Sequence, residues 1–203
     1  MPTLEFFFDC SSPWTYFAFR RLPPLCAALD TRIIWKPFLV GVVFNQVNDS
    51  VYRMREHPDS PKVRYLSKDI QDWARHLGMR ISFPPPVFPV NSARAMRGAL
   101  LALERGILVP YAEAVFAAYW TDLKDISQSE VLGAIWQQLG QQADECLSIV
   151  DSEPYRVGLK TNTGELIRRG GFGSPTFFIN GEDMYFGGDR LPLIEERLRA
   201  AQG

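Results

Sequence analysis

The sequence is poor in the residues that build metal centres and disulfide frameworks. It has three cysteines, Cys10, Cys26 and Cys146, at wide and irregular spacing, and two histidines, His57 and His76. An odd number of scattered cysteines predicts reduced thiols and no disulfide framework. Neither histidine has an obvious ligand residue beside it, so no metal site and no histidine-based catalytic triad is expected.

Two kinds of charge and hydropathy pattern are also missing. The formal net charge is -1, without the clustered lysines and arginines that nucleic-acid phosphates require. The amino end has no basic leader, and the longest weakly charged stretch, residues 107–120, is too short for a bilayer and contains Pro110 and Glu113. We expect a soluble, cytoplasmic protein with no nucleic-acid partner and no membrane partner.

The composition that remains is that of a folded domain, with 46% apolar and 22% charged residues in a chain of 203. A strand is predicted over residues 3–9, where an apolar run ends in Asp9. Ser12 and Pro13 then fit the cap and first position of a helix over residues 13–29, which Pro23 and Pro24 are expected to bend or break. A second strand follows at residues 31–38, so the chain opens as a parallel βαβ unit.

The middle of the chain has the spacing of helices, and the end returns to strands. The expected elements are a helix over about 61–77 ending at Gly78, a rigid extended loop at 83–89, a helix starting at Asn91 or Ser92, further helices to about 150, a helix from about 155 to 169, strands around 174–180 and 183–188, and a closing helix from 191. The dipeptide Asn180-Gly181 predicts a type I′ hairpin between the two strands.

This order predicts a thioredoxin-like domain interrupted by helices. Without the helical block, roughly a hundred residues remain, which is the size of a small domain. We assign residues 1–45 and 151–203 to the thioredoxin-like domain and residues 46–150 to a helical insertion domain. Ser174-Pro175 opens a strand at the place where thioredoxin-like domains keep a cis proline. The backbone N–H and C=O of Ser174 would then face outward beside the first helix, where an extended, peptide-like ligand can pair with them.

Several segments together resemble a known family: FFFDCSSPWTYFA, KPFLVGVVF, PKVRYLSKDIQDWA, FPVNSARAMR and FGSPTFFINGEDMYFGGDRL. They are similar to the 2-hydroxychromene-2-carboxylate isomerases and the kappa-class glutathione transferases, which are related to the DsbA disulfide oxidoreductases. The resemblance runs almost end to end and implies an α/β, thioredoxin-like fold with a large all-helical insertion (DsbA-like), glutathione as cofactor and a homodimer. DsbA-like relatives with Asp-x-x-Cys-Pro-Trp-Cys-Tyr align their attacking cysteine with Ser12 and their resolving cysteine with Thr15.

Ser12 is the candidate catalytic residue. A hydroxyl without a base is a poor nucleophile, so we expect Ser12 to donate a hydrogen bond to the thiolate of glutathione, helped by the positive end of the helix that starts at Pro13. The alternative for Ser12 is a helix cap and nothing more. Cys10 is expected to be an apolar residue at the strand end.

The resemblance also supplies candidate glutathione-binding residues beside Ser174 and Pro175. Gly188 and Asp189 would hold the γ-glutamyl ammonium, although Asp189 alone is equally a cap of the last helix. Lys62 matches a lysine that binds a carboxylate of glutathione, with a surface lysine as the alternative. Asn48 matches a binding asparagine only if one residue is deleted from the preceding loop.

An apolar slot for an aromatic substrate is predicted from Trp14, Phe38 and Phe44, with Tyr65 and the loop 83–89 as further walls; core packing is the alternative for all of them. The predicted activity is that of a glutathione-dependent isomerase of the 2-hydroxychromene-2-carboxylate isomerase type. The alternatives are a kappa-class-like glutathione transferase, a non-catalytic glutathione-binding protein, and a DsbA-like thiol-disulfide oxidoreductase, which the missing cysteine pair disfavours.

Overall fold

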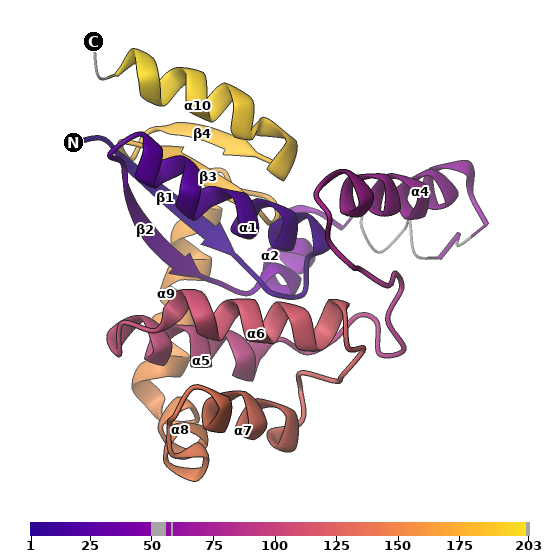
Figure 1. The fold of residues 1–203 in the computed structure, drawn as a ribbon, viewed down its shortest axis with the longest axis vertical. Helices are drawn as coiled ribbons and strands as arrows, with labels where there is room; N and C mark the ends of the chain where they lie inside the picture. Colours follow the sequence, from indigo (N-terminus) through magenta and orange to yellow (C-terminus); the bar gives the residue numbers. More distant parts are fainter. Residues whose placement is uncertain (50–55, 58, 202–203) are drawn as a thin grey trace.

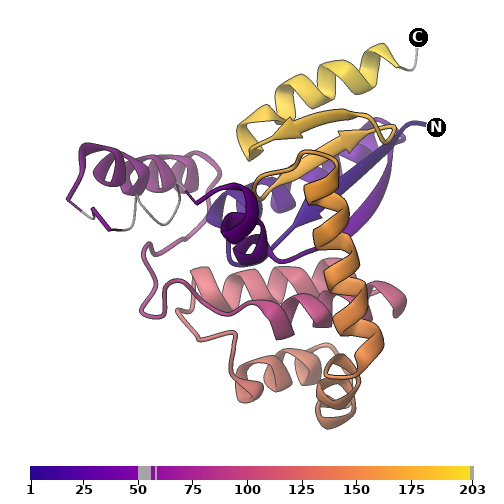
Figure 2. The same cartoon turned by 180° about the vertical axis from the view of Figure 1, so that it is seen from behind.

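The computed structural model describes residues 1–49, 56–57 and 59–201. A four-stranded sheet lies between helices, and further helices form a block at one end of it (Figures 1 and 2). The elements, in chain order, are β1 (Thr3–Phe8), α1 (Pro13–Ala28), β2 (Arg32–Pro37), α2 (Val40–Val47), α4 (Pro61–His76), α5 (Ala93–Glu104), α6 (Leu108–Trp120), α7 (Ser129–Gln138), α8 (Ala143–Val150), α9 (Glu153–Arg168), β3 (Thr176–Ile179), β4 (Asp183–Phe186), the 3₁₀ turn η1 (Gly188–Arg190) and α10 (Leu191–Ala200).

The sheet has the strand order β2-β1-β3-β4. Strand β1 is parallel to β2, whereas β3 is antiparallel to both β1 and β4. The opening βαβ unit is therefore confirmed. Asn180 and Gly181 have φ angles of 50° and 82°, and positive φ at both central positions is what a type I′ hairpin requires. The predicted hairpin between β3 and β4 is confirmed as well.

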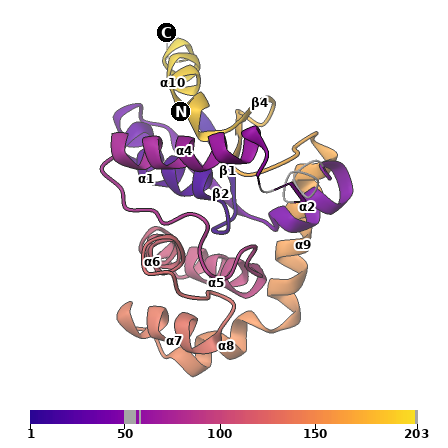
Figure 3. The same ribbon diagram turned by 90° about the vertical axis from the view of Figure 1, so that its right-hand side faces the viewer.

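Side chains alternate between the two faces of β1, and each face has its own core. Phe6 and Phe8 point into the larger core, where the Phe6 ring stacks on Phe177 at a centroid distance of 5.0 Å. Phe7 points the other way, into a smaller core with Phe38, Val40, Val43, Leu166 and Phe178. Helices α1 and α10 cover the first face, and α2 and α9 cover the second (Figures 1 and 3).

Helix α1 continues through its two internal prolines, so the expected break is absent. Pro23 and Pro24 lack the N–H groups that would bond the carbonyls four residues earlier. The side chains of Leu22 and Cys26, on either side of the prolines, are buried in the larger core. Their packing holds the helical backbone in place despite the lost hydrogen bonds.

Helix α2 was not expected from the sequence, and the predicted domain boundary at residue 45 falls inside it. Helix α4, from the predicted insertion, packs on α1: the Arg21 guanidinium lies 5.8 Å from the centre of the Trp73 ring. The division into residues 1–45 with 151–203 and residues 46–150 stays a prediction.

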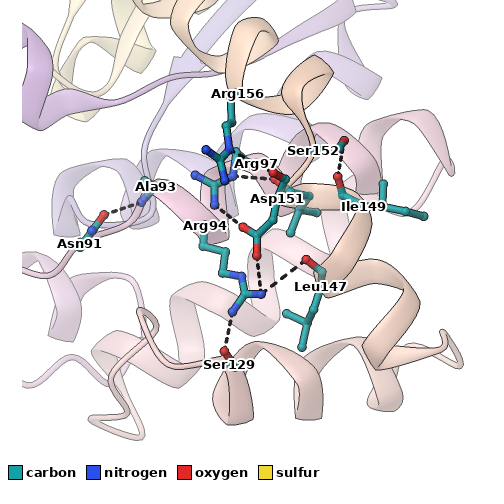
Figure 4. A network of polar contacts seen from close by, with 11 residues as sticks. Asn91, Ala93, Arg94, Arg97, Ser129, Leu147, Ile149, Asp151, Ser152 and Arg156 are labelled. Carbon is teal, nitrogen blue, oxygen red and sulfur yellow. Dashed lines mark hydrogen bonds and ion pairs between the residues drawn. The ribbon is translucent and has the colours of Figure 1, made fainter.

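Charged side chains join the helices of the block (Figure 4). The Asp151 carboxylate accepts from Arg94 Nη2 at 2.6 Å and from Arg97 Nη2 at 2.5 Å. Arg94 also bonds Ser129 Oγ, and Arg156 Nε donates to the Asp151 carbonyl at 3.0 Å. This network ties α5 to α7 and to the turn between α8 and α9.

The loop 83–89 lies between α4 and α5 in the chain and contacts the segment after β1 through Trp120 of α6. Its Phe83-Pro84 and Phe88-Pro89 bonds are cis, and both phenylalanine rings pack on Trp120. Trp120 is fully buried, and its Nε1 donates to the Cys10 carbonyl at 2.9 Å. The loop therefore supports the backbone just before Ser12.

Candidate active site

Segments from opposite ends of the sequence meet where β1 ends and α1 begins. Ser12 is the N-cap of α1, with extended backbone angles (φ -109°, ψ 123°), and its Oγ accepts from the Thr15 amide at 3.3 Å. The same hydroxyl donates to the Ser174 carbonyl at 3.2 Å. Ser12 is therefore both a helix cap and a donor directed at the loop before β3.

The Ser174-Pro175 peptide bond is cis, as predicted. The Ser174 side chain is buried: its Oγ accepts from the Asp9 amide at 3.1 Å and shares a hydrogen bond of 2.7 Å with Thr15 Oγ1. The Ser174 carbonyl lies beside the start of α1, as expected, where it accepts from Ser12; its pairing with a ligand stays a prediction. Within the described part of the chain, the Ser174 amide has no hydrogen-bond acceptor.

Asp9 is a site residue that the sequence reasoning did not select. It is fully buried, and its carboxylate accepts from the amides of Ser11 and Val40, both at 2.9 Å, and from Ser92 Oγ at 3.0 Å. Burial raises the pKa of Asp9, although these hydrogen bonds act in the opposite direction. Asp9 joins the starts of α1, α2 and α5. The available signal was an acid at the end of a strongly apolar strand.

Comparison with known proteins agrees with this geometry. The DSBA-like thioredoxin domain model matches residues 3–199. The chain belongs to the DsbA-like thioredoxin family. It is 25% identical over 199 residues to a 2-hydroxychromene-2-carboxylate isomerase of Sphingobium xenophagum, covering 97% of each chain, and 26% identical over 212 residues to glutathione S-transferase kappa 2 of Caenorhabditis elegans, covering 96% of this chain and 91% of the relative.

A solved 2-hydroxychromene-2-carboxylate isomerase superposes with a TM-score of 0.80 at 26% identity, over 98% of this chain and 95% of that one. The resemblance read from the sequence is thus confirmed, as is the DsbA-like thioredoxin fold. Relatives in this part of the DsbA-like family carry the names of enzymes, an isomerase and a transferase.

In this DsbA-like chain no cysteine occupies position 12 or position 15. Cys10, Cys26 and Cys146 are all buried and unpaired with one another. Burial raises the pKa of Cys10 far above its ordinary value and that of Cys26 to about 11. None of the three has the thiolate character of a reactive cysteine.

Gly188 lies directly against α1. A Cβ atom there would be 3.0 Å from the Trp14 carbonyl oxygen and 3.4 Å from Ala18 Cβ, so the close approach expected at Gly188 is made to α1. Asp189 lies in the turn η1 and pairs with Arg190; the residue that caps α10 is Arg190, without a side-chain bond. The alternative of Asp189 as the cap of the last helix is therefore wrong. Its carboxylate is half exposed.

In the sequence, Asn48 precedes residues 50–55 and Lys62 follows them; residues 50–55 are outside the described residues. Asn48 ends α2, and its Nδ2 donates to the Phe172 carbonyl at 3.1 Å, two residues before Ser174. Lys62 lies in the exposed first turn of α4. The buried residues of that helix, Ile70 and Ala74, are both in its second half. Asn48 thus supports the loop before Pro175, whereas the described contacts do not join Lys62 to it.

The three predicted substrate-binding aromatic residues have different surroundings. Phe38 is completely buried, 6.3 Å from the Phe7 ring centre, so its assignment to an open slot is wrong and it is a core residue. Phe44 packs at the edge of the same core and is half-buried. Trp14 is half-buried at the start of α1, with its ring edge-on to Phe17. Tyr65 is exposed on α4.

Three further properties bear on the chemistry. One surface cavity, of about 500 Å³, is lined by residues that include Gln71 and Arg80. Another, of about 690 Å³, is lined by residues that include Met1 and Asp30. Neither Ser12 nor Ser174 lines these two cavities. The described residues contain no cluster of histidine, cysteine and acidic side chains suited to a metal ion. In the part of the chain that the structure describes, no helix has the length and apolarity to span a membrane.

Proposed function

We propose that this protein is a glutathione-dependent isomerase of bicyclic aromatic acids of the 2-hydroxychromene-2-carboxylate type. The observation that supports it is the Ser12 hydroxyl at the amino end of α1, bonded to the loop that contains cis Pro175. This is the place where DsbA-like relatives with a Cys-Pro-Trp-Cys motif carry the attacking cysteine. The names of relatives at 25% and 26% identity are consistent with the proposal.

The groups around Ser12 fit a bound thiolate. Of the first amides of α1, those of Thr15 and Tyr16 bond Ser12, and Pro13 has none. The Trp14 amide has no acceptor within the described residues and lies at the positive end of a 16-residue helix. An anion placed there would accept a hydrogen bond from the Ser12 hydroxyl, in place of the Ser174 carbonyl, and a second hydrogen bond from the Trp14 amide. Each contact contributes about 1 kcal/mol, and together they lower a thiol pKa by one to two units.

Glutathione, when bound, would supply a thiolate for reversible addition to a carbon–carbon double bond of the substrate; elimination would restore the double bond and release the thiolate, so no thiol would be consumed. The chain's own groups bind and orient. The Ser174 amide would donate to the cysteinyl part of the tripeptide, and Ser12 would hold the sulfur. Asp189 would exchange Arg190 for the γ-glutamyl ammonium, with Lys62 and Asn48 as the further predicted contacts.

A kappa-type transferase is the second candidate, because a kappa-class relative matches 96% of the chain at 26% identity. The two activities share the thiolate site and differ in the fate of the thiol, which a transferase consumes. A thiol-disulfide oxidoreductase has no support from the three buried cysteines.

The test uses calorimetry and turnover on the purified full-length protein. We expect glutathione to bind, and 2-hydroxychromene-2-carboxylate to isomerise only when glutathione is present and without its consumption. The analogue with a methyl group in place of the thiol, γ-glutamyl-2-aminobutyryl-glycine, should bind and support no turnover. Absence of glutathione binding would refute the proposal, and stoichiometric loss of thiol with 1-chloro-2,4-dinitrobenzene alone would favour the transferase.

A further inference from the structure

Two phenylalanine rings lie on the surface beside the candidate site. Of the fourteen phenylalanines, all within the described residues, only Phe172 and Phe186 are exposed, each by 38%. Their ring centres are 4.4 Å apart at an interplanar angle of 48°. In a chain that buries its other phenylalanines wholly or in part, two exposed rings in mutual contact form a small apolar patch that is a candidate for contact with a ligand.

The backbone holds both rings next to Ser174 and Pro175. The carbonyl of Phe172 accepts from Asn48 Nδ2, and the amide of Gly187, after Phe186, donates to the Pro175 carbonyl at 3.0 Å. Phe186 is also the pairing partner of Thr176 across β3 and β4. The rings therefore flank the cis peptide bond from the chain segments before and after it.

Gly173 allows this arrangement. A Cβ atom at position 173 would lie 2.6 Å from Cε2 of Phe186, closer than real carbon atoms approach. The absence of a side chain lets the Phe186 ring lie against the backbone that leads into Ser174. The ring is thus fixed in position while much of it stays open to solvent.

Phe172 is close in the chain to Ser174, whose carbonyl bonds Ser12. Two Cα–Cα steps of 3.8 Å put Phe172 within about 8 Å of Ser174 along the chain, and the Ser174 carbonyl is 3.2 Å from Ser12 Oγ. A bicyclic ring stacked on the pair would lie beside the loop that bonds the amino end of α1. We infer that Phe172 and Phe186 bind the aromatic ring of the substrate, which places Asn48 as a positioning residue for Phe172.

This inference rests on the proposed function for the reaction, although the ring contact itself can be measured without glutathione. The variants are Phe172→Ala, Phe186→Ala, the double variant and Phe186→Tyr, which keeps an aromatic ring. Leu193→Ala is the matched control, since Leu193 is a 51% exposed apolar residue on α10. The probe is 1-naphthoate, whose binding is followed by its fluorescence, in parallel with calorimetry of glutathione.

One aromatic contact changes a binding constant by about 2- to 12-fold. We expect the double variant to weaken 1-naphthoate about tenfold or more and to raise the KM of the aromatic substrate, with glutathione affinity unchanged. Phe186→Tyr should retain binding, and Leu193→Ala should match the wild type. Naphthoate loss in a protein that binds no glutathione would support the ring contact and refute the proposed function.

Unchanged naphthoate binding in the double variant would overturn the inference. Equal losses of naphthoate and glutathione affinity would also overturn it, because the pair would then belong to the tripeptide site. Sedimentation of each variant gives a third check: conversion of a wild-type dimer to a monomer would identify the pair as a contact between copies of the chain and contradict the inference.

Discussion

Two helices of this protein, α1 and α4, begin with the same dipeptide, Ser-Pro, and differ in the segments that contact the capping serine. Ser12 and Ser60 both have extended backbone angles, and their Oγ atoms accept from the amide three residues on, at 3.3 and 3.4 Å. Each is followed by proline in the first helical position. The local sequence gives α1 and α4 the same start.

Among the described residues, only the first of these serines has a hydrogen-bond partner from a distant part of the chain. Ser12 Oγ donates to the Ser174 carbonyl, 162 positions away, and the Ser12 amide donates to the carbonyl of the buried Asp9 at 3.2 Å. Ser60 begins a helix whose first half contains no buried residue. The comparison shows that capping is a local property, whereas a directed hydrogen-bond donor needs the tertiary fold to bring a second segment to the helix end.

The largest expected difference between the two serines is in turnover. Ser12→Ala removes the donor to the bound thiolate, and loss of one such donor lowers kcat by about 100-fold or more. Ser60→Ala removes an equivalent cap away from the site and should leave kcat within about twofold. Steady-state isomerisation assays on both variants measure this, and equal effects would reduce Ser12 to an ordinary cap.

Removal of the partner opposite α1 should destabilise the fold. Ser174→Ala leaves the Asp9 amide and Thr15 Oγ1 without their bond in a buried place, which costs about 2 kcal/mol in the free energy of unfolding. Ser82→Ala, at an exposed serine, is the control. Urea denaturation measures both. A Ser174→Ala protein as stable as the control would show that the polar network adds nothing to stability.

The two caps should cost similar amounts of stability when removed. Loss of a serine N-cap destabilises a protein by about 1 kcal/mol, so Ser12→Ala and Ser60→Ala are expected to shift the free energy of unfolding alike while their activities differ. Thermal or urea unfolding checks this. A much larger loss for Ser12→Ala would mean that its bond to Ser174 carries stability as well.

The smallest expected effect is a pH slope from Asp9. Burial raises the pKa of Asp9 in the folded protein above its ordinary value of 3.8, so above pH 3.8 the folded protein keeps a proton that the unfolded chain releases. The stability of the wild type relative to Asp9→Asn should therefore fall as the pH rises from 3.8 through the folded pKa.

Asp125 is expected to give a pH dependence of stability with the opposite sign, and it serves as the control. Hydrogen bonds from Ser127 and Gln128 lower the pKa of Asp125, so the stability of the wild type relative to Asp125→Asn should fall as the pH decreases through the acid range. Denaturation curves at several pH values measure both slopes. Slopes of the same sign would contradict the burial argument for Asp9.

Much of the fold could be predicted from local signals. Ser12 and Pro13 set the start of α1, Asn180 and Gly181 set the hairpin, and the order of elements predicted a thioredoxin-like sheet. The cis bond before Pro175 was predicted from its place in the thioredoxin-like order of elements. These features depend on a few neighbouring residues, which a single sequence displays.

The site was harder to predict, because its contacts join distant segments. Nothing local distinguishes Phe38, which is buried, from Phe172, which is exposed. The bond between Ser12 and the Ser174 carbonyl depends on how β1 and β3 pair, and α2 starts where Asp9 accepts the Val40 amide. Helix α1 keeps its course through Pro23 and Pro24 because of tertiary packing around Leu22 and Cys26.

The pairing of residues 9–12 with residues 172–189 has a consequence for synthesis of the protein. On the ribosome, Ser12, at the start of α1, is synthesised 162 residues before Ser174, which lies just before the hairpin opposite α1. A chain ending before Phe172 would lack both exposed rings, the Ser174 carbonyl and Asp189. The candidate site would therefore be complete only after residues 172–189 have been synthesised.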